Sequence, residues 1–554
     1  MKIKIKKNGK IIKTVNVKKG ITPIGIYNKY DDISVDFILT SVKVNNNLQE
    51  LTFPLEKDSI IEFIDSNNRL GMLIYKNSLS LILIQAAHEI FQDVRIEIKH
   101  SISDGYYCEI YSRFLVTEKD VNKLQEKMKQ LINSDEQFRG KVMDITKARE
   151  IFRKNGDKTK LDLLRHYDRE KILIYQYKDI YEISSVPLIP SAGYLPIFDL
   201  KYLPPGIILR FPSNTKPNRI GEYQHQPNLF RIFTEYSRWG NILDLSYVSS
   251  LNEKVDSYEI NETILISEAL HENKISKIAR EIYEQFKEKN LVLISGPSSS
   301  GKTTFSKRLA IQLKAEGLSS LKISLDDYFV NRDDTPKDKN GEYDFESIDA
   351  IDKELVNKHI EKLLAHETIE VPKFNFIKGV REPKGHWEKL PEGGILIVEG
   401  VHGLNCNLTP SIEAKNKFKI YVSALTQLNL DNRNRIPTSD TRIIRRIVRD
   451  AFFRGYSAEE TLRRWDSIQR GERKYVFKFQ EDSDAMFNSA LVYELGVLKK
   501  YAIPALKKVA KDSEQYSSAV RLIKFLEFFR SVPENIIPAT SIIREFISGS
   551  AFNY

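Results

Sequence analysis

The first 65 residues alternate between apolar and polar positions in the manner of a small sheet. Residues 1–5 read Met-Lys-Ile-Lys-Ile, which has the period of two that is typical of a strand, and Asn8-Gly9 follows as a turn. Residues 23–30 have a short helical pattern, and a further strand pattern comes at 60–65. This order of hairpin, helix and strands predicts a compact α+β unit.

The second half of the chain contains uninterrupted apolar runs. Residues 291–295 (Leu-Val-Leu-Ile-Ser) and 321–325 (Leu-Lys-Ile-Ser-Leu) read as strands, with a helix predicted between them at 302–316. Their spacing of about 30 residues suits a right-handed βαβ unit in a parallel sheet. A third apolar run follows at 394–400, and an amphipathic helix at 264–285 precedes the first strand. The pattern predicts an α/β domain with a parallel sheet.

Length and composition indicate several globular domains. A chain of 554 residues is too long for one hydrophobic core, so about three or four domains are expected. With 41% hydrophobic and 29% charged residues, the composition excludes wholesale disorder. The formal net charge of +10 has two interpretations. One is an anionic partner such as a nucleotide, RNA or an acidic membrane surface, and the other is basic residues spread over the whole surface.

The cysteines and the N-terminus bear on the cellular compartment. Cys108 and Cys406 are the two cysteines, far apart in the sequence, which supports neither a disulfide framework nor a cysteine zinc site. The N-terminal residues lack the apolar core of a signal peptide, and the longest apolar stretch, at 79–87, is too short to cross a bilayer. We therefore expect a cytoplasmic protein without a membrane partner.

A complete phosphate-binding loop follows the strand at 291–295. Its glycines let successive backbone N–H groups curl around an anionic phosphate, its lysine places a charge on the β- and γ-phosphates, and its threonine offers a hydroxyl ligand to Mg²⁺. The helix that follows adds its positive N-terminal end. The flanking strand and helix weigh against a simple glycine- and serine-rich connection. We expect the nucleotide to contact Gly296, Pro297, Ser298, Ser299, Ser300, Gly301, Lys302, Thr303 and Thr304.

Two carboxylates come at the ends of the later strands. Asp326 directly follows the strand at 321–325, where an acceptor hydroxyl would be deprotonated or a hydrated Mg²⁺ held. Glu399 lies at the end of the third apolar run, where Asp is commoner, and either residue can order the water shell of the metal. The simpler interpretations are a solvated turn or helix cap for Asp326 and an incidental strand end for Glu399. The phosphate loop upstream favours the functional interpretation of both.

Arginines are concentrated behind the third apolar run. Eleven of them lie between positions 433 and 473. On a helix, Arg442, Arg446 and Arg449 fall near one another, while the isoleucines and the valine between them face the body of the protein. A guanidinium group stabilises the charge of a transferring phosphoryl group better than an ammonium group does. The cluster therefore predicts a phosphate lid, against the alternatives of a solvated basic face or an RNA-contacting one.

These motifs together resemble the uridine kinase/phosphoribulokinase family. The likeness covers about residues 288–500. Besides the loop, it includes Ser-Leu-Asp-Asp-Tyr at 324–328, Val-Pro-Lys-Phe-Asn-Phe at 371–376, Val-Glu-Gly at 398–400 and the arginine helix. The resemblance implies a P-loop kinase domain that uses ATP and Mg²⁺. Such a domain transfers the γ-phosphate to a nucleoside 5′-hydroxyl or to a sugar hydroxyl.

The resemblance also implies roles for single residues. Asp326 corresponds to the catalytic base, and arginines behind the third strand correspond to phosphate contacts. The residues that this assigns to catalysis are Asp326, Lys302, Arg449 and Arg454, and those assigned to Mg²⁺ are Thr303 and Glu399.

The acceptor side follows the family less closely. Glu346 falls where uridine kinases use an Asp on the ribose hydroxyls, and Tyr328 is expected beside the substrate as well. Phe374 replaces a Tyr that contacts the pyrimidine, and Gly379 replaces a His. Without these hydrogen bonds the pocket should discriminate poorly between bases, which puts uridine as the acceptor in doubt. Residues 470–474 lie outside the family pattern and are candidates for capping this pocket.

The first 66 residues resemble a TGS domain, the ubiquitin-like β-grasp module of threonyl-tRNA synthetases and some GTPases. The resemblance rests on Val44-Asn45-Asn46, on Leu-Gln-Glu-Leu at 48–51 and on the stretch at 58–65. It implies a binding module in front of the kinase-like domain.

Residues 67–220 resemble the editing domain of threonyl-tRNA synthetase. Asp-Gly-Tyr-Tyr at 104–107 and Pro-Ser-Ala-Gly-Tyr-Leu at 190–195 carry the likeness. The four positions that bind zinc or line the hydrolytic pocket in that family hold neither imidazoles nor a thiol here. They are Asn77, Leu81, Ser184 and Leu188. Editing activity is therefore not expected.

The expected fold is multidomain, with α+β units in front and an α/β unit behind. The predicted domains are a TGS-like β-grasp domain at 1–66, a synthetase editing-like domain at 67–220, a connector at 221–287, a P-loop kinase domain at 288–500 and a C-terminal helical extension at 501–554.

The first functional hypothesis is a cytoplasmic Mg·ATP-dependent kinase acting on a nucleoside or a related ribosyl compound. The alternative is an RNA- or ribosome-associated ATPase switch that uses the front domains for binding. A weaker alternative is a phosphoribulokinase-like sugar kinase. RNA binding, homo-oligomerisation and the identity of the small-molecule acceptor stay open.

Overall fold

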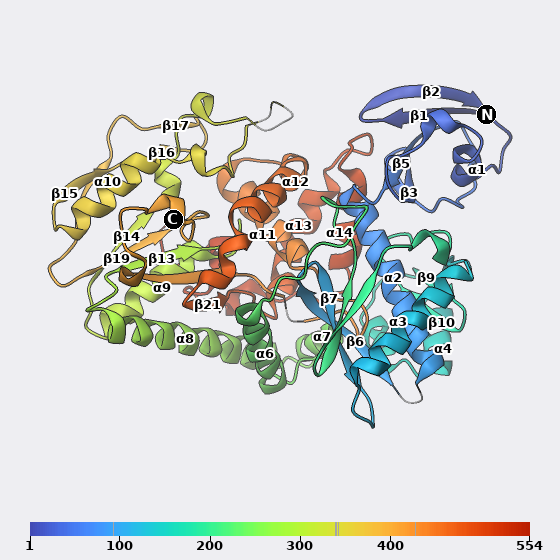
Figure 1. Cartoon of the computed structure of the whole chain (residues 1–554), viewed down its shortest axis with the longest axis horizontal. Helices are drawn as coiled ribbons and strands as arrows, with labels where there is room; N and C mark the ends of the chain where they lie inside the picture. Colours follow the sequence, from blue (N-terminus) through green and yellow to red (C-terminus); the bar gives the residue numbers. More distant parts are fainter. Residues whose placement is uncertain (92–93, 338–340, 342, 427, 554) are drawn as a thin grey trace.

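The computed structural model describes residues 1–91, 94–337, 341, 343–426 and 428–553. Its helices and strands form a multidomain α/β protein, with a mixed sheet at the N-terminus and a parallel sheet in the second half. Figure 1 shows these two sheets at opposite ends of the molecule, with the C-terminus beside the parallel one. The predicted fold class is confirmed.

The N-terminal sheet has five strands in the order β2-β1-β5-β3-β4. Ile3 and Ile5 are buried in its core while Lys2 and Lys4 are exposed, as the period of two predicts. β1 pairs in parallel with β5 and antiparallel with β2. The elements are β1 (Lys2–Lys7), β2 (Lys10–Asn16), α1 (Pro23–Tyr27), β3 (Leu39–Val44), β4 (Asn47–Gln49) and β5 (Ser59–Asp65).

Helix α2 (Arg69–Ile90) forms the core of the second part and packs against α3 (Glu118–Asn133). It is long and apolar enough to cross a membrane, but 83% of its most apolar window is buried inside the protein, as in a core helix. The other elements are β6 (Arg95–Ile102), β7 (Gly105–Tyr111), β8 (Arg139–Asp144), α4 (Ile145–Lys154), α5 (Lys158–Arg165), β9 (Lys171–Tyr177), β10 (Ile180–Ile183), β11 (Asp199–Leu203) and β12 (Gly206–Arg210).

A helical connector leads to the second half. Its helices are α6 (Pro227–Ile242), α7 (Val248–Asp256) and α8 (Ile260–Gln285). The last of these contains the amphipathic stretch that the sequence predicts, and it packs along α9 (Lys302–Ala315).

The parallel sheet has the strand order β14-β19-β13-β20-β21. Val292 and Ile294 of β13 pack with α8 and α9 on one face, and Leu291 and Leu293 pack with α10 (Lys353–Leu364) on the other. Because every pairing is parallel, the carboxyl ends of the strands meet at one edge. The strands are β13 (Leu291–Ser295), β14 (Ser320–Ser324), β19 (Ile395–Glu399), β20 (Lys417–Ser423) and β21 (Ala485–Asn488).

Two small hairpins flank this sheet. They are formed by β15 (Thr368–Val371) with β18 (His386–Lys389) and by β16 (Phe374–Asn375) with β17 (Val380–Arg381).

The end of the chain completes the core of the parallel sheet. The boundary predicted at residue 500 falls inside α13, and Leu522 and Phe546 belong to the same apolar cluster as Ile420 of β20. The helices predicted as a C-terminal extension at 501–554 therefore pack against the sheet domain and share its core. The helices are α11 (Thr438–Arg449), the π-helix η8 (Asp450–Arg454), α12 (Ala458–Tyr475), α13 (Glu494–Lys507) and α14 (Tyr516–Leu526).

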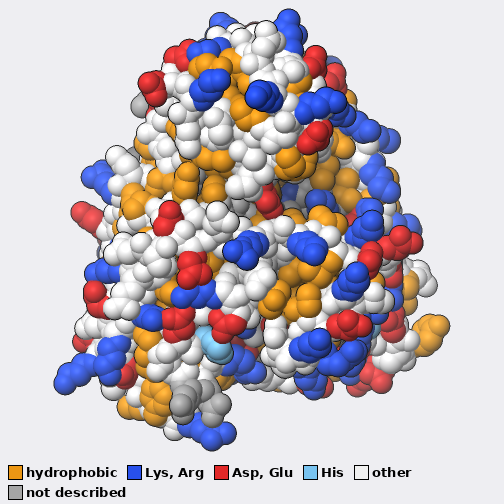
Figure 2. Space-filling view, turned by 90° about the vertical axis from the view of Figure 1, so that its right-hand side faces the viewer, with side chains coloured by type: hydrophobic (Ala, Val, Ile, Leu, Met, Phe, Trp, Pro, Cys, Tyr) orange, Lys and Arg blue, Asp and Glu red, His pale blue; other side chains and the backbone are white. Residues whose placement is uncertain are grey.

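Figure 2 shows the face of the molecule that lies on the right in Figure 1. Lys and Arg side chains are scattered over it among Asp, Glu and hydrophobic side chains. This face agrees with the interpretation that basic residues are spread over the surface.

Candidate active site

The phosphate loop leads from β13 into α9 at the carboxyl edge of the sheet. Gly296 lies so close to β20 that a Cβ there would clash with the carbonyl oxygen of Val422. Gly301 precedes α9 with a φ of 81°, which favours glycine. Lys302 is 8% exposed, and its ammonium donates to the carbonyl oxygen of Pro297 at 3.1 Å. The lysine is thus bonded to the loop itself.

Thr303 and Glu399, both predicted for Mg²⁺, meet beside the loop. The Oε1 atom of Glu399 accepts hydrogen bonds from the hydroxyls of Thr303 and Ser324, each at 3.3 Å. Burial raises the pKa of Glu399, and Lys322 and Lys302 act in the opposite direction. The structure therefore brings together two residues that are 96 positions apart.

These oxygen groups suit Mg²⁺, which binds proteins through one or two carboxylates and keeps several waters beside substrate phosphates. Within the described ranges, no group of three or more His, Cys, Asp or Glu side chains could hold a metal ion. A Mg²⁺ at Thr303 and Glu399 would take the rest of its ligands from water and nucleotide oxygens.

Asp326 lies in the 3₁₀ helix η3 (Leu325–Tyr328) directly after β14. Among the residues that the structure describes, its carboxylate has no hydrogen-bond partner. Its charge helps to raise the pKa values of Glu399 and Glu346, so it lies within electrostatic reach of both. The neighbouring Asp327 instead accepts a hydrogen bond from the N–H of Phe374 at 3.4 Å. An unbonded carboxylate at this edge can accept a proton from a substrate.

Arg442 and Arg445 of α11 hold the loop from inside the protein. Arg442 is 3% exposed, and its Nε donates to the carbonyl oxygen of Ser298 at 2.9 Å. Arg445 is completely buried, pairs with Glu494 and donates to the carbonyl oxygen of Ser299 at 3.4 Å. These two side chains do not belong to a solvated basic face. The predicted apolar face of the helix is buried at Ile443, Ile444, Ile447 and Val448.

Three further arginines surround Asp450. Arg446 donates to the hydroxyl of Ser298 at 2.6 Å, and its Nε lies 3.3 Å from the Asp450 carboxylate. Arg449 approaches the same carboxylate at 2.8 Å and Arg454 at 4.0 Å. Repulsion from Arg449, together with burial, lowers the pKa of Arg454 to about 10. The structure thus places the predicted Arg449 and Arg454 in one cluster beside the loop.

Glu346 lies against α12, within electrostatic reach of Lys302 of the phosphate loop. Its side chain touches Gly471, where a Cβ would clash with it. Burial and the negative charge of Glu472 raise the pKa of Glu346 to about 7, although Arg446 and Lys302 act against them. The predicted acceptor residue is therefore a carboxyl that can hold a proton near neutral pH.

The acceptor side contains a group of phenylalanines. The ring of Phe374 lies 5.7 Å from that of Phe329 and 5.2 Å from that of Phe376. The guanidinium of Arg454 lies 5.0 Å from the centre of the Phe376 ring. This group connects the predicted base-binding residue Phe374 to the arginine cluster.

Tyr328 is not brought to this site. Its side chain is completely buried in the core beneath η3, and its hydroxyl lies 2.9 Å from Nδ1 of His359. The prediction of a substrate contact at Tyr328 is wrong, because the hydroxyl is used inside the protein.

Two further carboxylates contact the phosphate loop, and neither contact was predicted from the sequence. Glu472 of α12 accepts from the N–H of Ser298 at 2.7 Å. Glu545 of the 3₁₀ helix η11 (Ile542–Glu545) accepts from the N–H of Thr304 at 3.1 Å and from its hydroxyl at 2.8 Å. Glu472 belongs to the stretch expected to cap the acceptor pocket, and no local pattern marks Glu545.

The editing-like part retains a small cavity. Its volume is about 70 Å³. The four positions aligned with the editing pocket all line it, namely Asn77, Leu81, Ser184 and Leu188. The four aligned positions therefore lie around one cavity, but they hold neither the imidazoles nor the thiol that bind zinc in the editing domain.

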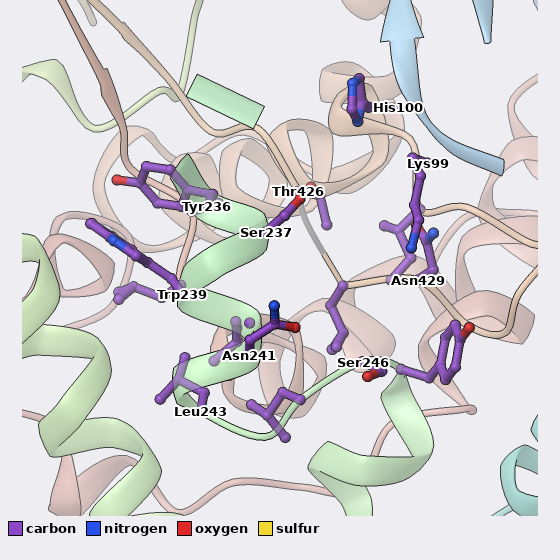
Figure 3. Close-up of a pocket in the computed structure, with 18 of the residues that line it drawn as sticks. Lys99, His100, Tyr236, Ser237, Trp239, Asn241, Leu243, Ser246, Thr426 and Asn429 are labelled. Atoms are coloured by element: carbon purple, nitrogen blue, oxygen red, sulfur yellow. The ribbon is translucent and has the colours of Figure 1, made fainter. Parts of the chain in front are cut away.

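A larger cavity of about 470 Å³ lies between β6, β7, α6 and the segments after β20 and β21. Figure 3 shows Lys99, Trp239 and Asn241 around it. Glu494 also lines it and pairs with Arg445, which bonds the phosphate loop. Arg445 therefore connects this cavity to the loop.

Comparisons with known proteins divide the chain in the same way as the motifs. The pattern of the Phosphoribulokinase / Uridine kinase family matches residues 291–494. The threonine–tRNA ligase of Desulforamulus reducens is 28% identical over 154 residues, which are 28% of this chain and 24% of the ligase. That of Coxiella burnetii is 26% identical over 204 residues, which are 36% of this chain and 31% of the ligase. The chain thus spans only about a quarter to a third of the length of these relatives.

Two solved structures of kinases also align. A possible uridine kinase from Bacillus stearothermophilus is 16% identical, with 39% of this chain and 98% of that chain covered and a TM-score of 0.28. A D-glycerate 3-kinase from Cryptococcus neoformans is 14% identical, with 48% and 89% covered and a TM-score of 0.22. Both scores are low, so neither alignment establishes a shared function.

The resemblances to the kinase family and to threonyl-tRNA synthetase that the motifs predicted are confirmed. Residues 291–494 match the pattern of the Phosphoribulokinase / Uridine kinase family, and the segment before them is similar to part of threonine–tRNA ligases.

Proposed function

We propose that this protein is an ATP-dependent kinase that phosphorylates a hydroxyl of a nucleoside or of a related ribosyl compound. The observation that supports this is the unbonded carboxylate of Asp326 at the same sheet edge as Lys302 and Glu399. Such a carboxylate can take the proton of an acceptor hydroxyl, which a kinase requires in addition to its ATP site.

Each group has a role in this proposal. Lys302 and the loop amides hold the phosphates of ATP. Asp326 accepts the proton of the acceptor hydroxyl as it attacks the γ-phosphate. Arg449 and Arg454 stabilise the charge on the transferring group. Mg²⁺, held by Thr303 and Glu399, would neutralise charge on the β- and γ-oxygens.

The chemical class of the acceptor is inferred from the side chains on the acceptor side of the site. Glu346 can bond to sugar hydroxyls, and the ring of Phe374 can stack on a base or a similar flat group. Neither Phe374 nor Gly379 offers a side-chain hydrogen bond to a base. We therefore expect similar kcat/KM values for acceptors that differ only in the polar edge of the base.

The alternative is an RNA-associated ATPase switch. It is supported by the similarity of the front segment to part of threonine–tRNA ligases, whose name includes tRNA. ATP hydrolysis stimulated by RNA, with no phosphorylated small molecule formed, would favour this alternative.

The test is a screen of the full-length chain with γ-labelled ATP against nucleosides and phosphorylated sugars. With an acceptor identified, Asp326→Asn should reduce transfer by about 100-fold or more while the Kd for ATP stays within about twofold. Asp334→Asn, at an exposed position a few residues further along the chain, is the matched control and should leave both values unchanged. Undiminished transfer in Asp326→Asn would remove the assigned base.

A further inference from the structure

The last segment of the chain lies directly on the phosphate loop. Glu545 bonds both the N–H and the hydroxyl of Thr304, and a Cβ on Gly301 would lie 2.6 Å from Cγ2 of Ile542. The N–H of Thr304 belongs to the first turn of α9, whose N–H groups lack intrahelical partners and are available to an anion. Glu545 thus occupies a donor that a nucleotide phosphate would use.

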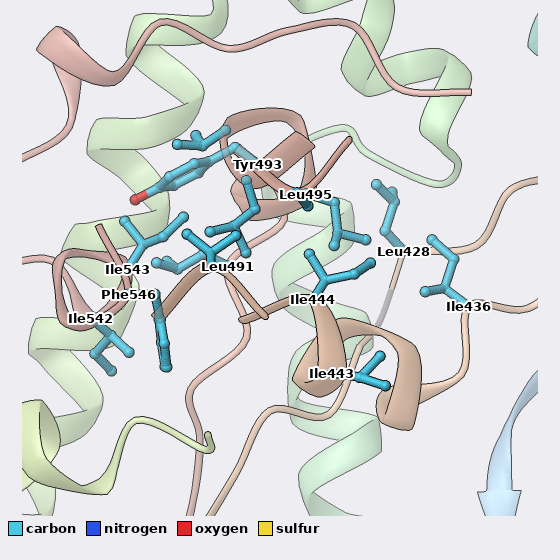
Figure 4. Packing of buried hydrophobic residues seen from close by; sticks show 14 of the residues in the cluster. Leu428, Ile436, Ile443, Ile444, Leu491, Tyr493, Leu495, Ile542, Ile543 and Phe546 are labelled. Atoms are coloured by element: carbon cyan, nitrogen blue, oxygen red, sulfur yellow. The ribbon is translucent and has the colours of Figure 1, made fainter. Parts of the chain in front are cut away.

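Apolar packing holds this segment in place. Ile542, Ile543 and Phe546 are completely buried, and Figure 4 shows them grouped near Tyr493. The guanidinium carbon of Arg445 lies 5.0 Å from the centre of the Phe546 ring. The carboxylate of Glu545 is therefore positioned by the protein core and is not carried on a loose tail.

Helix α12 brings a second carboxylate to the loop. Glu472 is completely buried, and its Oε1 atom accepts from the N–H of Ser298 while also pairing with Arg442. Its Oε2 atom has no hydrogen-bond partner among the described residues. A buried carboxylate with one oxygen unsatisfied is costly unless the surrounding cations compensate for it.

The lysine of the loop is engaged in the same closed arrangement. Lys302, expected on the β- and γ-phosphates, donates to the carbonyl oxygen of Pro297. Three cationic or N–H groups of the loop are therefore bonded within the protein, to Pro297, Glu472 and Glu545.

We propose that Glu545 and Glu472 compete with phosphate groups for the N–H donors of the loop and hold the loop closed. A nucleotide then binds only by displacing the Glu545 carboxylate from Thr304. The two carboxylates would also repel a polyphosphate, so the closed state lowers the affinity for ATP. The inference rests on the proposed function only in taking the loop as a nucleotide site.

The test is the Kd of Mg·ATP and Mg·ADP for the full-length chain, measured by titration calorimetry. Glu545→Ala should bind Mg·ATP about tenfold more tightly or better, because a charge-assisted competitor is removed. Glu316→Ala removes a carboxylate at the opposite end of the same helix α9 and should stay within about twofold of the unmodified chain. Unchanged or weaker binding of Mg·ATP to Glu545→Ala would overturn the proposal.

A second measurement needs no variant and covers the case in which Glu545→Ala does not fold. Amide hydrogen exchange of the peptide at 541–547 should increase when Mg·ATP is added, since the segment loses its bonds to Thr304. Unchanged or slower exchange there would also overturn the proposal.

Measurements of Mg·ATP binding and of phosphoryl transfer test this inference and the kinase assignment separately. Tighter Mg·ATP binding by Glu545→Ala with no phosphoryl acceptor found would support the closed loop and count against the kinase. Transfer to an acceptor with unchanged ATP affinity in the variant would support the kinase and refute the closed loop.

Discussion

The protonation state of Glu346 determines which hydrogen bonds this residue of the candidate site can form. Its carboxyl lies against Gly471 beside a second carboxylate, Glu472, and its pKa is raised from an ordinary 4.5 to about 7. A protonated Glu346 can donate a hydrogen bond to a sugar oxygen, whereas the ionised form can only accept one. The binding of an acceptor should therefore depend on pH around neutrality.

Glu346→Gln tests this pKa through stability. Between about pH 4.5 and pH 7 the folded protein keeps a proton that the unfolded chain has released, so stability falls as the pH rises through this window. The slope is at most about 1.4 kcal/mol per pH unit for one group. The glutamine variant lacks this loss, so its free energy of unfolding relative to the unmodified chain should rise from pH 4.5 to pH 7.5 in urea titrations.

The exposed Glu354→Gln serves as the control for that comparison and should change the free energy of unfolding by the same amount at both pH values. A constant difference for Glu346→Gln would mean that the carboxyl ionises as it does in the unfolded chain.

Helix α11 shows how one element can serve both the core and the site. Its isoleucines are buried in the sheet domain, while Arg442, Arg445 and Arg446 reach the carbonyl and hydroxyl oxygens of the phosphate loop. Helix α11 therefore supports the loop through oxygen atoms of Ser298 and Ser299.

Arg445→Met should destabilise the protein by about 3–5 kcal/mol, because it leaves Glu494 buried without its cation. Urea titration would measure this. The double variant Arg445→Met with Glu494→Leu removes both charges and should recover much of the loss, since a buried pair replaced by apolar groups is often close to neutral. If the double variant is less stable than Arg445→Met alone, the cost does not come from the unpaired Glu494.

Elements with a strong apolar pattern were predictable from the sequence, and their long-range contacts were not. The helix predicted at 302–316 is observed at Lys302–Ala315, because the pattern that specifies it is local. The contacts of Glu472 and Glu545 with the loop join residues 174 and 241 positions apart. No local pattern records which carboxylate meets which N–H group. The burial of Arg442 was missed for the same reason, because its partners come from α12 and the loop.

At the scale of the whole molecule, the N-terminal sheet is joined to the C-terminal helices. Lys6 of β1 pairs with Glu514 at 2.7 Å, and the amide of Asn46 donates to the carbonyl oxygen of Asp512, also at 2.7 Å. Asp512 and Glu514 immediately precede α14, and the chain continues from α14 to the segment that contacts the phosphate loop. The front of the protein and the candidate active site are thus joined through one stretch of chain.

The centre of this junction is a carboxylate shared by three helices. Asp440 of α11 is 2% exposed and bonds Arg521 of α14 at 2.6 and 2.8 Å and Arg69 of α2 at 3.2 Å. Although burial acts to raise it, these two cations hold the pKa of Asp440 below its usual value. The carboxylate therefore stays ionised inside the protein, and Arg521 contributes more to this than Arg69.

Arg521→Met should cost about 3 kcal/mol of stability, because Asp440 then keeps only the longer contact with Arg69. Arg69→Met should cost about 1 kcal/mol, since the two bonds to Arg521 remain and the Arg69 side chain is 24% exposed. Arg530→Met is the control, because Arg530 pairs with Asp168 and Asp256, whose side chains are 77% and 46% exposed, and such pairs add little. Urea titrations of the three variants give the ranking. A larger loss for Arg69→Met than for Arg521→Met would show that the front segment, and not α14, supplies the main support of Asp440.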